Sequence, residues 1–304
     1  MTSFKVACII PTRNGRALLE RLLISLSTQT AEFTTFIIDS DSSDGTREVA
    51  EKFTPNVKKI KAKNFNHGGT RQSVVNENPG FDIYIFLTQD TFLASSDAIE
   101  KILEPFENPV VGAVCGRQLP HADASIFAKH ARYFNYPEAD DLKFKVDIAR
   151  LGIKAAFLSN SFAAYRGAAL ESVGGFPSDV IFAEDMYVAA KMILIGWGIF
   201  YAGTATCFHS HNYTLNEEFR RYFDMGVFHA RETWIANTFG DAGGEGARFV
   251  KSELAFTKEN IFYWPECIVR NAVKLIGFKL GQNEAILPFA VKKNIGMYKG
   301  YWKR

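Results

Sequence analysis

The sequence has no strong charge of either sign and few cysteines. Its 304 residues carry 35 Lys and Arg against 33 Asp and Glu, a formal net charge of +2. A near-neutral chain of this kind argues against a protein that binds nucleic acid through a basic surface. The four cysteines, Cys8, Cys115, Cys207 and Cys267, lie far apart without C-x-x-C spacing. We therefore expect reduced thiols, as in a cytoplasmic protein, and no disulfides.

Long apolar runs and glycine-rich phosphate motifs are also absent. No stretch approaches the roughly 18–20 apolar residues that a membrane span needs, and Met1–Lys5 leads into a strand pattern without a signal peptide. We expect a cytoplasmic protein that meets a membrane only at its surface. Neither G-x-G-x-x-G nor G-x-x-x-x-G-K-[ST] occurs, which disfavours a dinucleotide site and a P-loop.

The composition is that of a globular chain, with 47% hydrophobic and 22% charged residues. Short β-rich runs alternate with helical patterns, which predicts an α/β fold with a doubly wound, mostly parallel sheet. The expected strands are 5–10, 35–38, 57–60, 83–87, 110–115, 157–166, 198–201 and 206–209. The expected helices are 17–28, 46–53, 70–76, 96–106, 169–173, 185–196 and 215–234.

The most informative segment is a strand that ends in acid. Residues 83–87 are an apolar run typical of a buried parallel strand, and Asp90 follows its carboxyl end, where open α/β sheets bind ligands. A second acidic turn, with Asp39, Asp41 and Asp44, follows the strand at 35–38. Carboxylates at one sheet edge suit a metal-bridged diphosphate. Asx-turn hydrogen bonding alone also explains the second turn.

Two further turns carry candidate binding groups. Thr12 and Arg13 follow the first strand and offer a hydroxyl and main-chain N–H groups to a nucleotide, although an ordinary β-to-α turn looks the same. Farther along, Gly68 beside His67 permits close approach of a ligand, and Arg71 can contact a base or a phosphate. A solvated loop before a helix is the alternative for this second turn.

Acids and imidazoles recur in the second half of the chain. Glu184 and Asp185 at a helix start can supply a general base for a hydroxyl, although the helix dipole alone favours acids there. His209 and His211 lie two apart on a strand and so face one side, where one can join Asp90 on a metal. No further His or Cys completes a zinc set, so Mg²⁺ or Mn²⁺ is the expected ion. Two structural histidines remain the alternative.

Together these motifs resemble family-2 glycosyltransferases with the GT-A fold, over residues about 5 to 230. The motifs that carry this resemblance are Pro11–Asn14, Asp39–Thr46, Thr88–Asp90, Glu184–Asp185 and the following histidines. A narrower resemblance is to the bacterial rhamnosyltransferase branch. It rests on Phe65–Arg71, Leu87–Asp90, Asn160–Arg166, Phe182–Asp185 and His209–Tyr213.

The resemblance implies an inverting transfer of L-rhamnose from dTDP-β-L-rhamnose to a saccharide, expected to be lipid-linked, in bacterial surface polysaccharide (O-antigen) synthesis. A UDP- or GDP-sugar donor stays open. The resemblance further implies Asp185 as the catalytic base, and Asp90 with His211 as ligands of Mg²⁺ or Mn²⁺. The implied substrate-binding residues are Thr12, Arg13, Asp39, Asp41, His67, Gly68, Arg71, Gln89, Glu184, Arg220 and Arg221.

One position departs from the family pattern. Thr88 stands where the first acid of the family's D-x-D site is expected, so a single carboxylate is left for the ion. We expect Arg220 or Arg221 to help hold the diphosphate. Two rival functions are a nucleotidyltransferase, which would want a basic phosphate loop after the first strand, and a sugar- or nucleotide-binding module without catalysis.

The pattern of the chain changes after residue 116. Residues 121–150 lack a strand signal and predict a helical or loop insertion. We predict a GT-A domain over 1–240, with a nucleotide-binding half at about 1–116 and an acceptor-side half at about 117–240. A hinge at 240–246 leads to a helical, basic and aromatic region over 241–304, which suits a membrane surface. Packing on the core or on another subunit, in a homo-oligomer, is the alternative.

Overall fold

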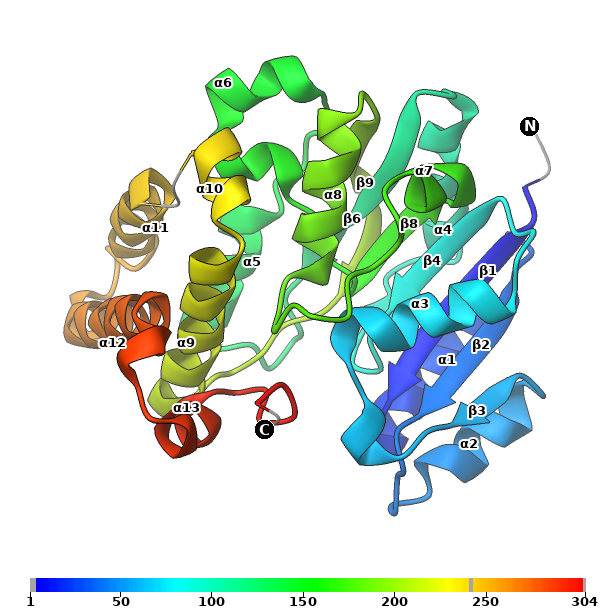
Figure 1. The fold of residues 1–304 in the computed structure, drawn as a ribbon, viewed down its shortest axis with the longest axis horizontal. Helices are drawn as coiled ribbons and strands as arrows, with labels where there is room; N and C mark the ends of the chain where they lie inside the picture. Colours follow the sequence, from blue (N-terminus) through cyan, green and yellow to red (C-terminus); the bar gives the residue numbers. More distant parts are fainter. Residues whose placement is uncertain (1–3, 241–242, 303–304) are drawn as a thin grey trace.

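The computed structural model describes residues 4–240 and 243–302 and is built around one nine-stranded sheet (Figure 1). The strands are β1 (Val6–Thr12), β2 (Thr34–Asp39), β3 (Val57–Lys59), β4 (Ile83–Leu87), β5 (Phe92–Leu93), β6 (Val111–Leu119), β7 (Asp141–Lys143), β8 (Phe162–Arg166) and β9 (Gly198–Phe208). Their order across the sheet is β3-β2-β1-β4-β8-β6-β9-β5, and β7 pairs with β9.

Most of the strands point the same way. β1, β2, β3 and β4 are parallel to one another, β8 runs against β4 and β6, and β9 is parallel to β6. Only β5, β7 and β8 run in the opposite direction. The predicted mostly parallel sheet is confirmed. As a consequence, the carboxyl ends of β1, β2, β4, β6 and β9 meet at one edge, together with the start of β8.

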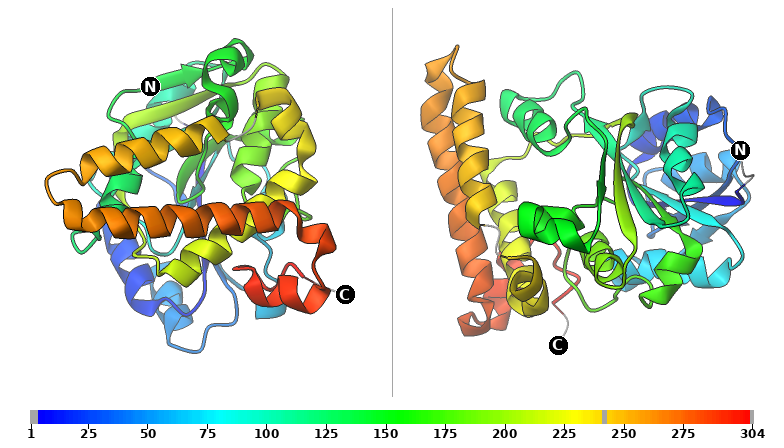
Figure 2. Two further views of the ribbon diagram at one scale, coloured as in Figure 1. Left: turned by 90° about the vertical axis from the view of Figure 1, so that its left-hand side faces the viewer. Right: turned by 90° about the horizontal axis from the view of Figure 1, so that it is seen from above.

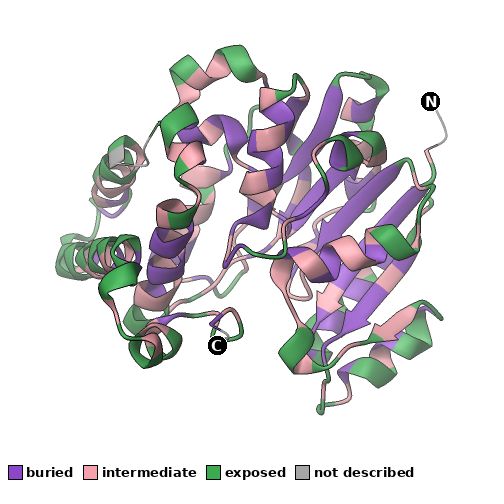
Figure 3. Ribbon diagram, in the orientation of Figure 1, coloured by how far each residue is buried: buried purple, intermediate pink, exposed green. Residues whose placement is uncertain are grey.

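Helices cover both faces of the sheet. The helices are α1 (Arg16–Ser27), α2 (Thr46–Phe53), α3 (His67–Glu77), α4 (Ala98–Leu103), α5 (Ile126–Asn135), α6 (Ile148–Leu151), α7 (Gly167–Ser172), α8 (Glu184–Leu194), α9 (Leu215–Arg231), α10 (Thr233–Phe239), α11 (Gly243–Phe256), α12 (Trp264–Gln282) and α13 (Phe289–Ile295). α1, α2 and α4 share one buried cluster, and α3, α7 and α8 share the other. The sheet between them is buried on both faces (Figure 3).

The two-sided burial explains the apolar run at 83–87. Along β4, Tyr84 and Phe86 belong to the α3, α7 and α8 cluster, while Ile83, Ile85 and Leu87 belong to the other. Successive side chains of a strand point to opposite faces, so a strand covered on both faces must be apolar throughout.

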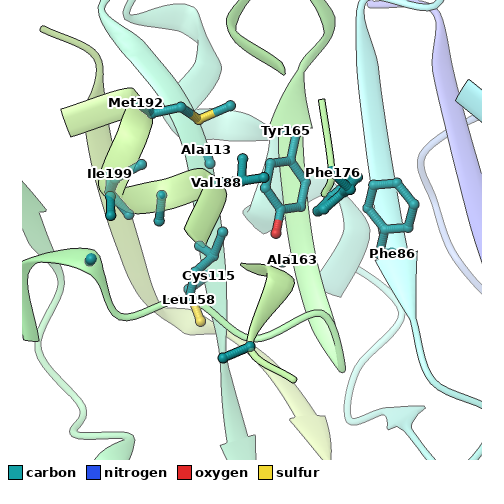
Figure 4. Close-up of a cluster of buried hydrophobic side chains, with 14 of the residues drawn as sticks. Phe86, Ala113, Cys115, Leu158, Ala163, Tyr165, Phe176, Val188, Met192 and Ile199 are labelled. Carbon is teal, nitrogen blue, oxygen red and sulfur yellow. The ribbon is translucent and has the colours of Figure 1, made fainter. Parts of the chain in front are cut away.

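An aromatic cluster connects this core to the sheet edge. Phe86, Tyr165 and Phe176 pack edge to face, with ring centroids 5.1–5.5 Å apart (Figure 4). The hydroxyl of Tyr165 donates a hydrogen bond of 2.7 Å to Oδ1 of Asn160. The core therefore fixes the position of a loop at the carboxyl edge.

Several boundaries differ from the sequence-based expectations. Residues 121–150 contain the short strand β7, and the two strands expected at 198–209 form the single strand β9. The helix expected at 70–76 begins earlier, at His67, because the Asn66 side chain caps it by accepting from the main-chain N–H of Gly69. The helix expected at 215–234 ends at Arg231, and α10 follows it.

The C-terminal region is helical, as expected. α12 lies across α9, and Figure 2 shows α11 and α12 as a long pair on one side of the molecule. Of the hinge predicted at 240–246, residues 241 and 242 lie outside the described residues, and α11 already begins at Gly243. Within the described ranges, no helix combines the length and apolarity that crossing a membrane requires.

Candidate active site

Two adjacent acids stand at the start of α8, beside the carboxyl edge of the sheet. The preceding residue, Ala183, has a φ of 57°, a left-handed conformation that costs energy for a residue with a side chain and is often found at functional sites. Asn160 bonds to both acids. Its main-chain N–H donates to Oδ2 of Asp185 at 3.0 Å, and its amide Nδ2 donates to Oε1 of Glu184 at 2.9 Å.

The two acids have opposite electrostatic environments. Burial alone would raise the pKa of Glu184, but Arg71, whose Nη1 lies 3.0 Å from its Oε1, together with His67 and Asn160 holds the pKa below its usual value. Burial, and then the nearby charge of Glu184, raise the pKa of Asp185 to about 7. Asp185 is therefore a carboxylate with the basicity that a general base needs near neutral pH.

A second group of side chains gathers where β4 and β9 end. Oδ2 of Asp90 lies 3.5 Å from Nε2 of His209 and 3.6 Å from Nε2 of His211. One ligand atom from each residue lies within 4.8 Å of the others, close enough for the three to hold one metal ion together. Burial and the neighbouring His209 lower the pKa of His211 to about 3, so the ring is neutral.

His209 is the part of this group that the sequence left undecided. The sequence favoured only one of the two histidines as a ligand, with His211 chosen, whereas the structure brings both to Asp90. His209 is buried, and its Nδ1 lies 2.8 Å from Oε1 of Gln118 on β6. His211 is more open and stacks on Tyr213, with ring centroids 4.9 Å apart.

The two neighbouring arginines of α9 have different surroundings. Arg220 donates to the main-chain carbonyls of Asn294 and Gly296, so its guanidinium is occupied by the C-terminal segment and is not positioned to hold a diphosphate. Arg221 lies over the rings of Phe182 and Tyr213, at 4.8 and 5.8 Å. Among the described residues no carboxylate forms an ion pair with Arg221, which leaves it as a cation beside the acids and histidines.

In the first part of the chain, hydrogen bonds connect the ends of β1 and β4. Oε1 of Gln89 accepts from the Thr12 hydroxyl at 2.5 Å and from the main-chain N–H of Arg13 at 2.8 Å. Asp39 is fully buried, and although its Oδ2 accepts from Ser42, its Oδ1 has no partner among the described residues. Asp39 thus retains a free acceptor, whereas Gln89 and Thr12 bond to each other.

Other expected binding residues are placed differently. Arg71 is buried against Glu184, and it also donates to the carbonyl of His67, so its guanidinium serves the acid pair and does not face open space. A Cβ on Gly68 would lie 1.9 Å from the carbonyl oxygen of Pro177, so the close approach is to the chain itself. Asp41 is half exposed and pairs with Lys59 at 3.2 Å.

Comparison with known proteins agrees with this geometry. A sequence model described as glycosyl transferase family 2 matches residues 7–174. The chain belongs to this family. It is 48% identical over 301 residues to the O-antigen chain rhamnosyltransferase RfbN of Salmonella typhimurium, covering 98% of this chain and 96% of that protein. It is 47% identical over 305 residues to the O-antigen chain rhamnosyltransferase WbaN of Salmonella anatum, covering 99% and 96%.

Solved structures share the fold of this glycosyltransferase. The mannosyltransferase PcManGT from Pyrobaculum calidifontis, in complex with GDP-Man and Mn²⁺, aligns with a TM-score of 0.59 and 18% identity, covering 98% of this chain and 85% of that one. TarS 1–349 of S. aureus in complex with UDP-GlcNAc aligns with a TM-score of 0.55 and 19% identity, covering 96% and 84%. The expected GT-A fold is confirmed, and the chain is an enzyme, not a binding module.

Proposed function

We propose that this glycosyltransferase transfers L-rhamnose from dTDP-β-L-rhamnose, with inversion, to a saccharide acceptor in O-antigen synthesis. The observation that carries the proposal is the identity of 47–48%, over nearly the whole chain, to two O-antigen chain rhamnosyltransferases. The basic carboxylate of Asp185 supports the inverting chemistry, since one base on the acceptor side is what a single displacement needs.

In the proposed reaction the acceptor hydroxyl attacks C1 of rhamnose. Its proton passes to a carboxylate oxygen of Asp185 while the bond between C1 and the diphosphate oxygen breaks, and dTDP leaves with the electron pair. Asn160 holds the base in place by donating to Oδ2. The unpaired guanidinium of Arg221 is suited to balance the charge that develops on the leaving diphosphate.

We propose Asp90, His209 and His211 as ligands of a divalent cation, Mn²⁺ or Mg²⁺. One carboxylate and two imidazoles whose ligand atoms lie within 4.8 Å of one another fit such an ion. When bound, the ion would stabilise the negative charge of the diphosphate. On the nucleotide side, Thr12 and Arg13 would line the pocket of a pyrimidine base. The buried Asp39 would support this pocket from below, through the hydrogen bond that its Oδ2 accepts from the main-chain N–H of Ser42.

A panel of nucleotide sugars tests the donor. Purified protein is incubated with dTDP-β-L-rhamnose, a UDP-sugar and a GDP-sugar, each with and without Mn²⁺ or Mg²⁺, and donor hydrolysis and transfer to a rhamnose-accepting O-antigen intermediate are measured. We expect metal-dependent turnover of the rhamnose donor and an α-linked product. Preferred turnover of a UDP- or GDP-sugar would overturn the rhamnose assignment, and a β-linked product would overturn inversion.

We also propose that the acceptor is lipid-linked and that the protein lies on the inner face of the plasma membrane through α12. The side chains that α12 and the preceding turn leave exposed are largely apolar. Phe262 is 91% exposed, and Ile268, Leu275 and Ile276 are each about 60% exposed. The last three recur at helical spacing and so form one stripe, the pattern of a helix lying in a membrane interface. Lys258, in the turn after α11, and Lys279, on α12, are exposed as well.

Co-sedimentation with vesicles tests this contact. We expect the protein to pellet with vesicles containing anionic lipid, and a Phe262→Ser, Ile268→Ser double variant to stay in the supernatant. A matched double variant at exposed apolar residues elsewhere, Ile24→Ser and Val146→Ser, should still pellet. Wild-type protein that stays in the supernatant, or that instead forms dimers broken by the α12 substitutions, would contradict the membrane proposal.

A further inference from the structure

We propose that Gln118 is a positioning residue that fixes the tautomer of His209, and thereby makes His209 a third metal ligand that substitutes for the acid missing at Thr88. The inference rests on the metal-assisted function proposed above. It assigns a role to a buried amide that no motif indicated. Gln118 is 1% exposed and so cannot touch a substrate.

The orientation of the Gln118 amide is determined by its neighbours. Nη1 of Arg132 lies 2.5 Å from Oε1 of Gln118, and a guanidinium can only donate hydrogen bonds. The atom facing Arg132 must therefore be the amide oxygen. The amide nitrogen donates on its other side to the hydroxyl of Ser159 at 2.9 Å. A flipped amide would place two donors against each other at Arg132.

The tautomer of His209 follows from this orientation. Nδ1 of His209 lies 2.8 Å from the same Oε1, which can only accept, so Nδ1 carries the proton and donates it. In a neutral ring Nε2 then has a lone pair. That lone pair lies at 3.5 Å from Oδ2 of Asp90, which also offers only lone pairs. The hydroxyl of Ser161, 3.5 Å from Nε2, is the other polar contact of that atom. The two acceptors repel each other unless a proton or a metal ion lies between them, and a metal ion satisfies both at once.

This arrangement is the one used by histidines that bind metals. Such a histidine donates its second ring N–H to a protein acceptor, which orients the ring and increases the basicity of the ligand nitrogen. Here the acceptor is itself held by Arg132 and Ser159. The resulting set of two imidazoles and one carboxylate favours Mn²⁺ over Mg²⁺, because Mg²⁺ prefers oxygen ligands.

Mn²⁺ binding to the metal-free protein tests the role without any sugar substrate. The electron paramagnetic resonance signal of free Mn²⁺ gives the dissociation constant. We expect Gln118→Leu to weaken binding about 10–100-fold, and Gln118→Glu, which still accepts from Nδ1 and Arg132, to restore it. Gln29→Leu is the control, since Gln29 also makes three hydrogen bonds but only to main-chain groups of Ser25, Ser95 and Ile99. Equal weakening by Gln118→Glu, or none by Gln118→Leu in folded protein, would overturn the proposal.

A measurement on the unmodified protein is independent of folding effects in the variants. Long-range ¹H–¹⁵N spectra of the imidazoles distinguish the two tautomers, with His209→Gln used to assign the signals. We expect His209 to carry its proton on Nδ1 in the metal-free protein. The ¹⁵N resonance of its Nε2 should then shift when a diamagnetic ion such as Mg²⁺ or Zn²⁺ is added in place of Mn²⁺. A proton on Nε2 would contradict the inference. Neither the Mn²⁺ titration nor the imidazole spectra use a sugar substrate. A wrong assignment of the sugar donor would therefore leave the expected results of both unchanged.

Discussion

At the scale of single residues, the site separates two adjacent carboxyl groups by their surroundings. Glu184 faces Arg71 and stays ionised. No cation in the described part of the chain pairs with Asp185, and burial and then Glu184 raise its pKa. Neighbouring acids whose pKa values are pushed apart in this way can take different roles. Glu184 then serves as a fixed negative charge that raises the pKa of Asp185, and Asp185 is the group that can accept a proton.

The pH dependence of the reaction follows from this tuning. A base with a pKa of about 7 is protonated below that pH, so kcat/KM should fall as the pH drops through about 7. Glu184→Gln removes a negative charge that raises the pKa of Asp185, and should move this acidic limb to lower pH. Glu138→Gln, at an exposed acid, should leave it in place. An acidic limb that stays at the same pH in Glu184→Gln would mean that another group sets it.

Replacing the base itself should separate activity from stability. Asp185→Asn is expected to lower kcat about 10²–10⁴-fold, the usual contribution of a general base, while donor binding is kept. The native state holds the proton of Asp185 up to about pH 7, whereas the unfolded chain releases it near pH 4. The folded protein therefore loses stability as the pH rises between these values.

The amide cannot ionise, so Asp185→Asn should melt at a higher temperature than the wild type at pH 8. The difference should shrink at pH 4, where both proteins carry a neutral group. Thermal unfolding at the two pH values measures this. An equal change in melting temperature at both would argue that the carboxylate is not strained by its surroundings.

The candidate site residues that the sequence could indicate differ in one physical respect from those that it could not. Asp90 and Asp185 stand at a strand end and a helix start, which local patterns reveal. Gln118 acts only because β6 lies beside β9 in the register that pairs it with Cys207, and this contact is not local. Arg71 looked like a ligand-binding cation because the sequence does not show that Glu184 is buried against it.

At the scale of elements, three glycines allow α9 and α12 to pack at backbone distance. A Cβ on Gly281 would lie 2.1 Å from the carbonyl oxygen of Phe223, one on Gly277 2.5 Å from that of Phe219, and one on Gly226 2.1 Å from that of Phe278. No side chain fits between the helices at these points. The glycines therefore determine how closely the C-terminal helices approach the rest of the protein.

Two glycine substitutions with opposite expected signs test this packing. Gly281→Ala should force the helices apart and destabilise the protein by about 1–3 kcal/mol, as overpacking does. Gly246→Ala in α11, where nothing lies within 4 Å of the added Cβ, should stabilise it by about 0.5–1 kcal/mol through helix propensity. Urea denaturation gives both values. Destabilisation of similar size in both variants would mean that loss of glycine, and not the contact, is responsible.

Helices and strands whose buried positions recur at a regular spacing could be predicted from the sequence. Those whose position and length depend on long-range contacts were harder to predict. Of the apolar positions expected in the helix at 17–28, Leu19, Leu22, Leu23 and Leu26 are buried while Leu18 is exposed. β7 is only Asp141–Lys143, too short and polar to give a signal. β9 continues through Gly203, where the chain passes so close to Glu138 that a Cβ would lie 1.9 Å from its carbonyl oxygen.

At the scale of the whole molecule, the C-terminal segment connects the helices to the loops around the acid pair. The hydroxyl of Tyr301 donates to the carbonyl of Asp179 at 3.2 Å, and that of Tyr298 donates to the carbonyl of Phe65. Sequence composition indicated a separate basic and aromatic region beyond residue 240, and that boundary stays a prediction. Charge and aromatic content could not show that this segment reaches loops over a hundred residues earlier in the chain.

The adjacent arginines of α9 distinguish a structural connection from a site residue. Arg220→Gln removes hydrogen bonds to the carbonyls of Asn294 and Gly296, and should cost about 1.5–3 kcal/mol of stability, the range for hydrogen bonds from a charged group. Its KM for the donor should stay close to that of the wild type. Arg221→Gln removes the cation proposed for the diphosphate, and should lower kcat/KM about 10²-fold with little change in melting temperature. Steady-state kinetics and thermal unfolding of the two variants provide both readouts.

Because the two positions are adjacent on one helix, each variant is the control for the other. An Arg220→Gln variant with weakened donor binding and unchanged stability would place the diphosphate contact there and contradict the role assigned to Arg221.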